Sequence, residues 1–221
     1  MPASDQTLFP NGSRPSIIFD FGGVLMDWDP RYLYSRLFAG DEAAVERFLA
    51  EVGFFEWNAR QDEGRAFSAA VADLSARYPH YASLIQAYEN RWEESLGEPV
   101  WGTVAILQAL RQAGFPLYAL SNWSAEKFPV IRRKYGFFEW FDDIVLSGEV
   151  RLVKPDPRIF TAFLERIGRS APDCLFIDDS TANLEAANRL GFHTLHFQSP
   201  EQLAGDLVRL QLLPPSIVAD I

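Results

Sequence analysis

Four short segments of this 221-residue chain hold side chains suited to phosphoryl transfer. They are Asp20-Phe21-Gly22-Gly23, Ser121-Asn122, Lys154-Pro155 and Asp178-Asp179. Moving a phosphoryl group requires a nucleophile, a cation that neutralises the phosphate oxygens, and positioned hydrogen-bond donors. Together the segments offer all three, so their residue types predict this chemistry.

Asp20 ends an apolar run, where its carboxylate can attack phosphorus. The glycines behind it, Gly22 and Gly23, allow backbone amides to approach an anion closely. Ser121 and Asn122 follow a second apolar run and can donate hydrogen bonds to phosphate oxygens. We therefore expect Gly23, Ser121 and Asn122 to bind substrate.

Lys154 precedes Pro155, and a residue before proline favours extended backbone, so its ammonium is expected on a loop within reach of Asp20 and the phosphate. Asp178 and Asp179 are adjacent carboxylates, which supply the hard oxygen ligands that Mg²⁺ prefers. This pair is expected to bind a magnesium ion that also contacts Asp20.

The surrounding pattern indicates how a fold would bring these segments together. Apolar runs typical of buried strands cover residues 16–20, 116–120, 143–146, 174–177 and 193–197. Helical patterns cover 100–113, 125–135, 157–167 and 180–190, each followed by glycine, and a last helix begins at Ser199-Pro200. The alternation predicts an α/β fold, a doubly wound, Rossmann-like parallel sheet whose ligand site lies at the carboxyl ends of the strands.

Residues 29–98 interrupt the alternation with amphipathic helical patterns at 31–38, 41–52, 66–78 and 81–96, and without a convincing strand. We therefore predict an inserted helical cap domain at 29–98 and a catalytic core made of 15–28 and 99–221. Residues 1–14 are polar and lack the basic start and apolar run of a signal peptide, so a flexible tail is expected there.

Composition narrows the class of protein. The chain has 20 lysines and arginines against 30 aspartates and glutamates, a net charge of -10, which argues against nucleic acid or an anionic membrane as partner. Cys174 is the single cysteine, so no internal disulfide can form and a cytoplasmic location is expected. No apolar run approaches the roughly 20 residues that a membrane-spanning helix needs. The sequence does not indicate the oligomeric state.

Read with their neighbours, the four segments resemble the ordered motifs of a known family. They are Phe19-Asp20-Phe21-Gly22-Gly23-Val24-Leu25, Leu120-Ser121-Asn122, Val153-Lys154-Pro155-Asp156 and Phe176-Ile177-Asp178-Asp179-Ser180. In this order they are similar to the haloacid dehalogenase-like hydrolases, over nearly the whole chain after residue 14. The helical insertion after the first motif is similar to the branch that includes sugar-phosphate phosphatases of the α-glucose-1-phosphate phosphatase type.

The resemblance implies a magnesium-dependent phosphatase that hydrolyses a small phosphate monoester, a sugar phosphate being one candidate, through an aspartyl-phosphate on Asp20. Its partner would be a small phosphorylated metabolite, which Lys154 orients while balancing the phosphate charge. By position in the motifs, the metal ligands would be Asp20, the carbonyl of Gly22, Asp179 and Asp178, and Asn183 would contact a water bound to the metal.

One position departs from the commonest first motif, which has a second aspartate two residues after the nucleophile. That aspartate protonates the leaving alcohol and later activates water, and here the position is Gly22. Losing a general acid–base group typically costs about 10²–10⁴ in rate. The similar sugar-phosphatase branch also has glycine there, so the mechanism is weakened but not excluded. Asp27, at the entrance to the cap, is a candidate replacement acid, and a water activated by metal or substrate is another.

Within the cap, Trp57, Arg60 and Asp62 lie in a polar break between helical patterns, where a loop can reach over the site and contact the substrate. Trp57 and Arg60 are therefore candidate substrate-binding residues. An exposed polar loop with a buried aromatic anchor accounts for the same residues about equally well.

Two other functions remain open. A metal-independent 2-haloacid dehalogenase, of the same superfamily, uses the equivalent aspartate on carbon, but such dehalogenases typically have uncharged residues at the metal-binding acid, and here Asp178 and Asp179 are both present. A non-catalytic binding module would keep the phosphate pocket without turnover. Each segment alone also fits an ordinary turn or helix cap, whereas four of them at strand ends, in this order, favour the phosphatase.

Overall fold

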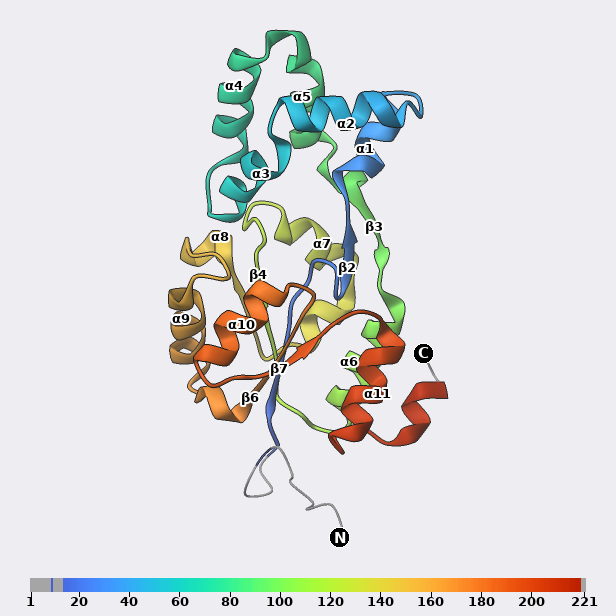
Figure 1. The fold of residues 1–221 in the computed structure, drawn as a ribbon, viewed down its shortest axis with the longest axis vertical. Coiled ribbons are helices and arrows are strands. Elements are labelled where there is room, and N and C mark those ends of the chain that lie inside the picture. Colours follow the sequence, from blue (N-terminus) through green and yellow to red (C-terminus); the bar gives the residue numbers. More distant parts are fainter. Residues whose placement is uncertain (1–8, 10–13, 220–221) are drawn as a thin grey trace.

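Five parallel strands form the central sheet of the computed structural model, which describes Phe9 and residues 14–219. In spatial order they are β5 (Asp143–Leu146), β4 (Leu117–Ser121), β1 (Ser16–Phe19), β6 (Cys174–Asp178) and β7 (His193–His196). β1 pairs with β4 on one side and β6 on the other, so the predicted α/β fold with a Rossmann-like parallel sheet is confirmed (Figure 1). Most of the tail expected at 1–14 lies outside the described residues.

Helices cover both faces of the sheet, so successive residues of a strand enter two different cores. Ile17 and Phe19 of β1 lie in one apolar cluster, and Ile18 lies in the other. The first face is covered by α6 (Trp101–Gln112), α7 (Phe128–Lys134) and α11 (Pro200–Arg209), the second by α9 (Pro157–Ile167) and α10 (Thr181–Arg189). A strand buried on both faces must be apolar throughout, which explains the continuous runs in the sequence.

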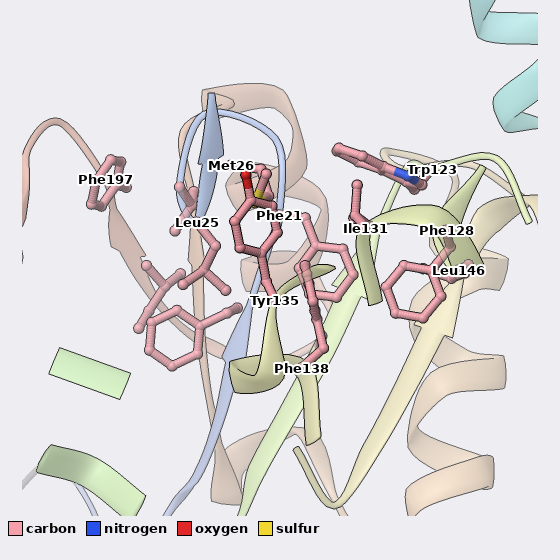
Figure 2. Close-up of a cluster of buried hydrophobic side chains, with 14 of the residues drawn as sticks. Phe21, Leu25, Met26, Trp123, Phe128, Ile131, Tyr135, Phe138, Leu146 and Phe197 are labelled. Atoms are coloured by element: carbon pink, nitrogen blue, oxygen red, sulfur yellow. The ribbon is translucent and has the colours of Figure 1, made fainter. Parts of the chain in front are cut away.

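Aromatic rings of the first core anchor the loop that follows β1. The ring of Phe21 lies 5.0 Å from that of Phe138 and 5.7 Å from that of Phe128, measured between centroids. Figure 2 shows Leu25 of the same loop and Met26, the first residue of the next strand, within this cluster. Aromatic pairs at such separations contribute about 0.5–1.5 kcal/mol each beyond their buried area. These apolar contacts therefore hold the loop after β1 in place.

The chain enters the helical insertion through β2 (Met26–Trp28) and leaves it through β3 (Leu96–Pro99). These two strands pair antiparallel, with Met26 opposite Pro99 and Trp28 opposite Leu96. The inserted helices are α1 (Pro30–Leu37), α2 (Glu42–Glu51), α3 (Phe54–Asp62), α4 (Phe67–Arg77) and α5 (Ala82–Asn90). They gather at the top of the molecule in Figure 1, beyond the end of the sheet.

The structure corrects two details of the prediction for this insertion. The segment 81–96, predicted as one helix, is α5 followed by a 3₁₀ turn (Trp92–Ser95) and the strand β3. Residues 57–62, predicted as a break between helices, belong to helix α3. That helix starts after Gly53, whose φ is 62°, and has no side-chain cap, so the usual start signal is missing from the sequence. Among the described residues, no helix is long and apolar enough to cross a membrane.

Candidate active site

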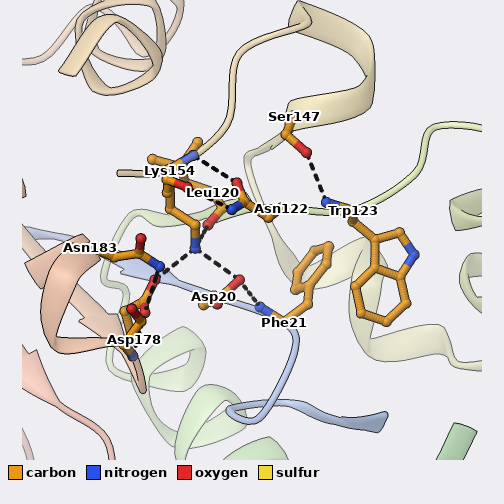
Figure 3. Close-up of polar contacts among 10 residues, drawn as sticks. Asp20, Phe21, Leu120, Asn122, Trp123, Ser147, Lys154, Asp178 and Asn183 are labelled. Carbon is orange, nitrogen blue, oxygen red and sulfur yellow. Dashed lines mark hydrogen bonds and ion pairs between the residues drawn. The ribbon is translucent and has the colours of Figure 1, made fainter. Parts of the chain in front are cut away.

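Lys154 lies where the carboxyl ends of β1, β4 and β6 meet (Figure 3). Its Nζ is 3.0 Å from Oδ1 of Asp20 and 2.7 Å from Oδ2 of Asp178, and it donates to the backbone oxygen of Leu120 at 2.9 Å. An ammonium group has three donors, and these contacts use all of them. The structure thus brings together three of the side chains that the sequence singled out.

Burial and the ion pairs with Lys154 shift the pKa values of this group in opposite directions. Burial raises the pKa of Asp20 to about 6, although Lys154 opposes the rise and Asp178 adds to it. Burial alone would lower the pKa of Lys154, but Asp20 and Asp178 outweigh it, so the pKa of this lysine lies above its ordinary value. The ammonium therefore stays charged and favours the ionised Asp20 that nucleophilic attack requires.

Asp178 is fully buried, and protein donors occupy its carboxylate. Oδ1 accepts from the backbone N–H of Ser180 at 2.8 Å and from Nδ2 of Asn183 at 3.0 Å. Oδ2 accepts from Lys154 at 2.7 Å and from the same amide of Asn183 at 3.1 Å. A carboxylate has about four acceptor sites. Asp178 is therefore a fixed counter-ion that holds Lys154 and Asn183 in place.

Asp179 completes an acidic cluster in which one oxygen each of Asp20, Asp178 and Asp179 lies within 4.8 Å of the others. Mg²⁺ binds carboxylate and carbonyl oxygens at about 2.0–2.1 Å, so oxygens on opposite sides of the ion stand about 4 Å apart. The spacing and the donor type of the cluster both fit such an ion. Hydrogen bonds already occupy the acceptor sites of Asp178. Asp20 and Asp179 are therefore the members of the cluster whose oxygens are available to bind an ion.

Gly23 has left-handed backbone, with φ at 72°, and a Cβ built on it would lie 2.9 Å from Cγ of Asp179. Its N–H already donates to the backbone oxygen of Met26 at 2.9 Å, within the loop. Gly23 was predicted to contact the substrate. In the structure, its lack of a side chain leaves room for the carboxylate of Asp179. Gly22 differs, because a Cβ there meets nothing within 4 Å.

Alanine at Gly23 is expected to push the carboxylate of Asp179 aside, since both the positive φ and the contact exclude a side chain. Disturbing the surroundings of a metal ligand typically costs about 10–100-fold in affinity, and we expect a loss of this size for Mg²⁺ in titration calorimetry. Gly22→Ala, which has room for its methyl group and keeps its carbonyl, is the matched control. Equal affinities in the two variants would show that Asp179 does not hold the ion.

The predicted phosphate-binding pair divides into two roles. Nδ2 of Asn122 donates to the backbone oxygen of Lys154 at 2.9 Å, and its Oδ1 accepts from the backbone N–H of Lys154 at 2.8 Å. This side chain thus clamps the loop that carries the lysine. The hydroxyl of Ser121 is buried; it lies near the carboxylate of Asp20, whose pKa it lowers, but makes no hydrogen bond of good geometry to any described residue. An unpaired buried hydroxyl costs about 1–3 kcal/mol, so Ser121 is suited to pair with a ligand oxygen.

A cavity of about 120 Å³ lies where the insertion meets the core. Its lining residues are Gly22, Trp28, Asn58, Asp62, Phe67, Trp92, Asn122, Trp123 and Ser124. Pockets for drug-sized ligands measure about 300–1,000 Å³, so this one suits a small molecule. The aromatic lining residues were not singled out in the sequence, because the contacts that bring Trp28, Phe67 and Trp92 to one place are long-range. Trp123, directly after the second motif, is the one that carried a local signal.

Two cap residues predicted to bind substrate are not among those that line this cavity. Trp57 is buried inside the cap, and its Nε1 donates to the backbone oxygen of Ala70 at 3.2 Å. The side chain of Arg60 is 68% exposed and pairs with Glu63 at 3.6 Å. Asp62, from the same segment, does line the cavity.

Asp27, the candidate replacement acid, also stands outside the lining of this cavity. It belongs to β2, and its carboxylate accepts a hydrogen bond from the hydroxyl of Tyr32 at 2.6 Å. The same carboxylate packs against Gly97 of β3. Through these contacts, Asp27 connects the strands β2 and β3 with α1, the first helix of the cap.

The sheet topology, the buried Lys154–Asp20 pair and the acidic cluster agree with what sequence comparison finds. The chain belongs to the haloacid dehalogenase-like hydrolases, whose family model matches residues 16–191. It is therefore an enzyme of the hydrolase class, and relatives with the name of phosphatase are found among curated proteins.

Two curated relatives differ in how much of their own length the match covers. A phosphoglycolate phosphatase from Mesorhizobium japonicum is 25% identical and covers 81% of this chain and 80% of its own. Acyl-CoA dehydrogenase family member 10 from Mus musculus is 29% identical over 91% of this chain, but the match spans only 20% of the mouse protein. The chain is thus similar to most of one phosphatase and to one part of a much longer protein.

Solved structures with different bound molecules share the fold. A HAD family enzyme from Bacteroides thetaiotaomicron, in complex with magnesium and inorganic phosphate, has a TM-score of 0.66 at 24% identity, covering 85% of this chain and 96% of that one. The L-2-haloacid dehalogenase from Xanthobacter autotrophicus has a TM-score of 0.58 at 19% identity, covering 94% and 88%. At these identities the likeness establishes the fold alone.

Proposed function

We propose that this hydrolase is a Mg²⁺-dependent phosphatase that cleaves a small phosphate monoester through an aspartyl-phosphate on Asp20. The buried ion-paired group of Asp20, Lys154 and Asp178, with Asp179 beside it, is the observation that carries the proposal. It offers a nucleophile, a fixed positive charge and oxygen ligands for a cation in one place. Phosphatases among the relatives support the same reading.

In this mechanism a carboxylate oxygen of Asp20 attacks phosphorus in line with the leaving oxygen, and water then hydrolyses the aspartyl-phosphate. Lys154 neutralises charge on the phosphoryl oxygens, and the unpaired hydroxyl of Ser121 donates to one of them. Asn122 holds the lysine in place through its two backbone hydrogen bonds.

Asp20, Asp179 and the backbone carbonyl of Gly22 would hold the Mg²⁺ ion, which when bound supplies positive charge that offsets the phosphate oxygens. Asp178, the other acid of the motif, would act behind this group by keeping Lys154 charged and in position. Asn183 would support the arrangement through its hydrogen bonds to Asp178.

The substrate is a small phosphorylated metabolite, because the cavity beside Gly22 measures only about 120 Å³. Four of its lining residues are aromatic, namely Trp28, Phe67, Trp92 and Trp123. Since the chain carries a net charge of -10, a phosphate is attracted by the local charge of Lys154 and not by the overall field. A panel of sugar phosphates, nucleotides and phosphoglycolate, ranked by kcat/KM, would identify the preferred leaving group.

Removal of divalent metal is expected to stop the reaction. With p-nitrophenyl phosphate as substrate, chelation by EDTA should lower the rate by at least about 10²-fold, because the ion supplies several kcal/mol of charge stabilisation. Added Mg²⁺ should restore the rate, while Na⁺ at equal ionic strength should not. Phosphate release that is indifferent to chelation would contradict the proposal.

The same assay separates the two rival functions. Halide release from 2-chloropropionate in the presence of EDTA, without phosphatase activity, would identify a dehalogenase, whose fold the chain shares. Binding of inorganic phosphate without turnover of either substrate would identify a binding module.

A further inference from the structure

The proposed phosphatase has glycine at residue 22, where the first motif commonly has an aspartate that donates a proton. The structure shows that a side chain would fit at this position. Gly22 has no positive φ, and a Cβ built on it meets nothing within 4 Å. It opens onto the cavity between the core and the cap. A donor carried by another element can therefore occupy the room that a side chain at residue 22 would have used.

Asp62, the last residue of α3, lines that same cavity from the cap side. Among the described residues that form the lining, it is the single titratable side chain. Its carboxyl accepts a hydrogen bond from Nδ2 of Asn58 at 3.3 Å, and Oδ1 of Asn58 accepts from the hydroxyl of Tyr88 at 2.9 Å. Asn58 is thus oriented by a buried tyrosine and in turn positions Asp62.

The backbone of Asp62 is tied to the core. Its carbonyl oxygen accepts from the hydroxyl of Ser147 at 2.6 Å, and that hydroxyl accepts from the backbone N–H of Trp123 at 2.9 Å. Ser147 opens the short helix α8 (Ser147–Val150), after β5, and Trp123 follows the second motif. The end of α3 is therefore fixed against the segments that carry Ser147 and Trp123, and Asp62 lines the cavity together with Gly22 and Asn122 of the core.

The surroundings keep this carboxyl protonated at neutral pH. Burial raises the pKa of Asp62 to about 8; the backbone N–H of Ser124 opposes the rise, and the negative charges of Asp20 and Glu63 add to it. A proton donor works best when its pKa lies near the working pH. Asp27 is placed differently, since its contacts are with Tyr32 and Gly97 and it does not line the cavity.

We propose that Asp62 is the general acid and base of the reaction, supplied by the cap in place of the side chain that Gly22 lacks. In the first step the bond between phosphorus and the ester oxygen breaks as Asp20 bonds to phosphorus, and the proton of Asp62 passes to the departing oxygen, which leaves as neutral alcohol. In the second step ionised Asp62 accepts a proton from the water that attacks the aspartyl-phosphate. Phosphate departs, Asp20 is free again and Asp62 is reprotonated.

This inference rests on the proposed phosphatase function, and a pair of substrates of almost equal shape tests it. Phenyl phosphate releases a phenol whose pKa, about 10, is that of the tyrosine side chain, whereas p-nitrophenyl phosphate releases a much weaker base that needs no proton. For Asp62→Asn we expect kcat/KM to fall by about 10²-fold or more with phenyl phosphate and by less than about 10-fold with p-nitrophenyl phosphate. The second substrate also reports that the variant is folded.

The base role adds a kinetic signature that a merely structural residue would not produce. Asp62→Asn should release a burst of one equivalent of p-nitrophenolate and then turn over slowly, because the aspartyl-phosphate forms but is hydrolysed poorly. Glu56→Gln, at an exposed position of the same helix, is the matched control and should leave the rates with both substrates unchanged. Adding Gly22→Asp to Asp62→Asn should restore part of the activity with phenyl phosphate, since residue 22 has space for a side chain.

The outcomes separate the two proposals. Equal losses with both substrates, or no loss with either, would overturn the role of Asp62 while leaving the phosphatase intact. A selective loss with phenyl phosphate in Asp27→Asn, and not in Asp62→Asn, would assign the acid to Asp27. Failure of the unaltered protein to hydrolyse either aryl phosphate would instead count against the phosphatase function itself.

Discussion

Asparagine in place of Asp20 is expected to abolish turnover. The amide has the shape of the carboxylate but cannot form the covalent bond to phosphorus, so kcat with p-nitrophenyl phosphate should fall by at least about 10⁴-fold, as for other covalent nucleophiles. Acid quenching during turnover, followed by mass spectrometry, should yield a phosphorylated peptide containing residue 20 from the unaltered protein and none from the variant.

The fold should survive this change, because Lys154 keeps its contacts with Asp178 and with the backbone oxygen of Leu120. Circular dichroism and the denaturant midpoint would verify it. Asp41→Asn, at the exposed start of α2, is a control for replacing a carboxylate far from the site. Activity of Asp20→Asn within tenfold of the unaltered protein would rule out the covalent mechanism.

Methionine in place of Lys154 should cost both activity and stability. The ammonium is fully buried and is the counter-ion of Asp20 and Asp178, so its loss leaves two carboxylates without a partner. Breaking a buried ion pair by removing one member typically costs about 3–5 kcal/mol in the free energy of unfolding. Loss of a charge that faces the phosphoryl oxygens should also lower kcat by about 10²–10³-fold.

A double variant separates the two effects. Adding Asp178→Asn to Lys154→Met removes one uncompensated charge, so urea unfolding should show part of the lost stability returning while activity stays low. Lys134→Met, in the exposed last turn of α7, is the control and should change neither quantity. If Lys154→Met were as stable as the unaltered protein, the buried ion pairs seen here could not be intact in solution.

The central sheet is predictable from the sequence because its local signals agree with its tertiary role. Each strand is a short apolar run, as burial on both faces requires. Helix α9 was predicted at 157–167 and is observed there, with Asp156 accepting from the first turn and Gly168 in left-handed backbone at its end. Where caps and periodicity coincide, element boundaries can be read from the residues alone.

The two strands that lead into the cap escaped prediction for a physical reason. β2 has three residues and β3 has four, Leu-Gly-Glu-Pro, and glycine and proline are poor strand formers. Their pairing is long-range, between residues about 70 apart along the chain. Helix α3 was missed for a similar reason, because its start is a glycine with positive φ and its apolar face is made largely of aromatic residues.

The candidate site was predicted as residue types but not as contacts. Asp20, Lys154 and Asp178 could be grouped because the fold class places strand ends together. Nothing in the sequence showed that the side chain of Asn122 would form hydrogen bonds with the backbone of Lys154, or that Asp62 would line the cavity. Those facts depend on how loops and cap pack, and no periodicity encodes them.

The pairing of β2 with β3 brings the two ends of the helical insertion together. Because Met26 pairs with Pro99, the points of entry and exit stand side by side, and the core could be closed there by a short turn. The core would keep the nucleophile and its lysine, while the cap would take Asp62 and most of the aromatic lining with it. If Asp62 is the proton donor, replacing the insertion would change the leaving-group preference and the proton donor together, while the core kept Asp20 and Lys154.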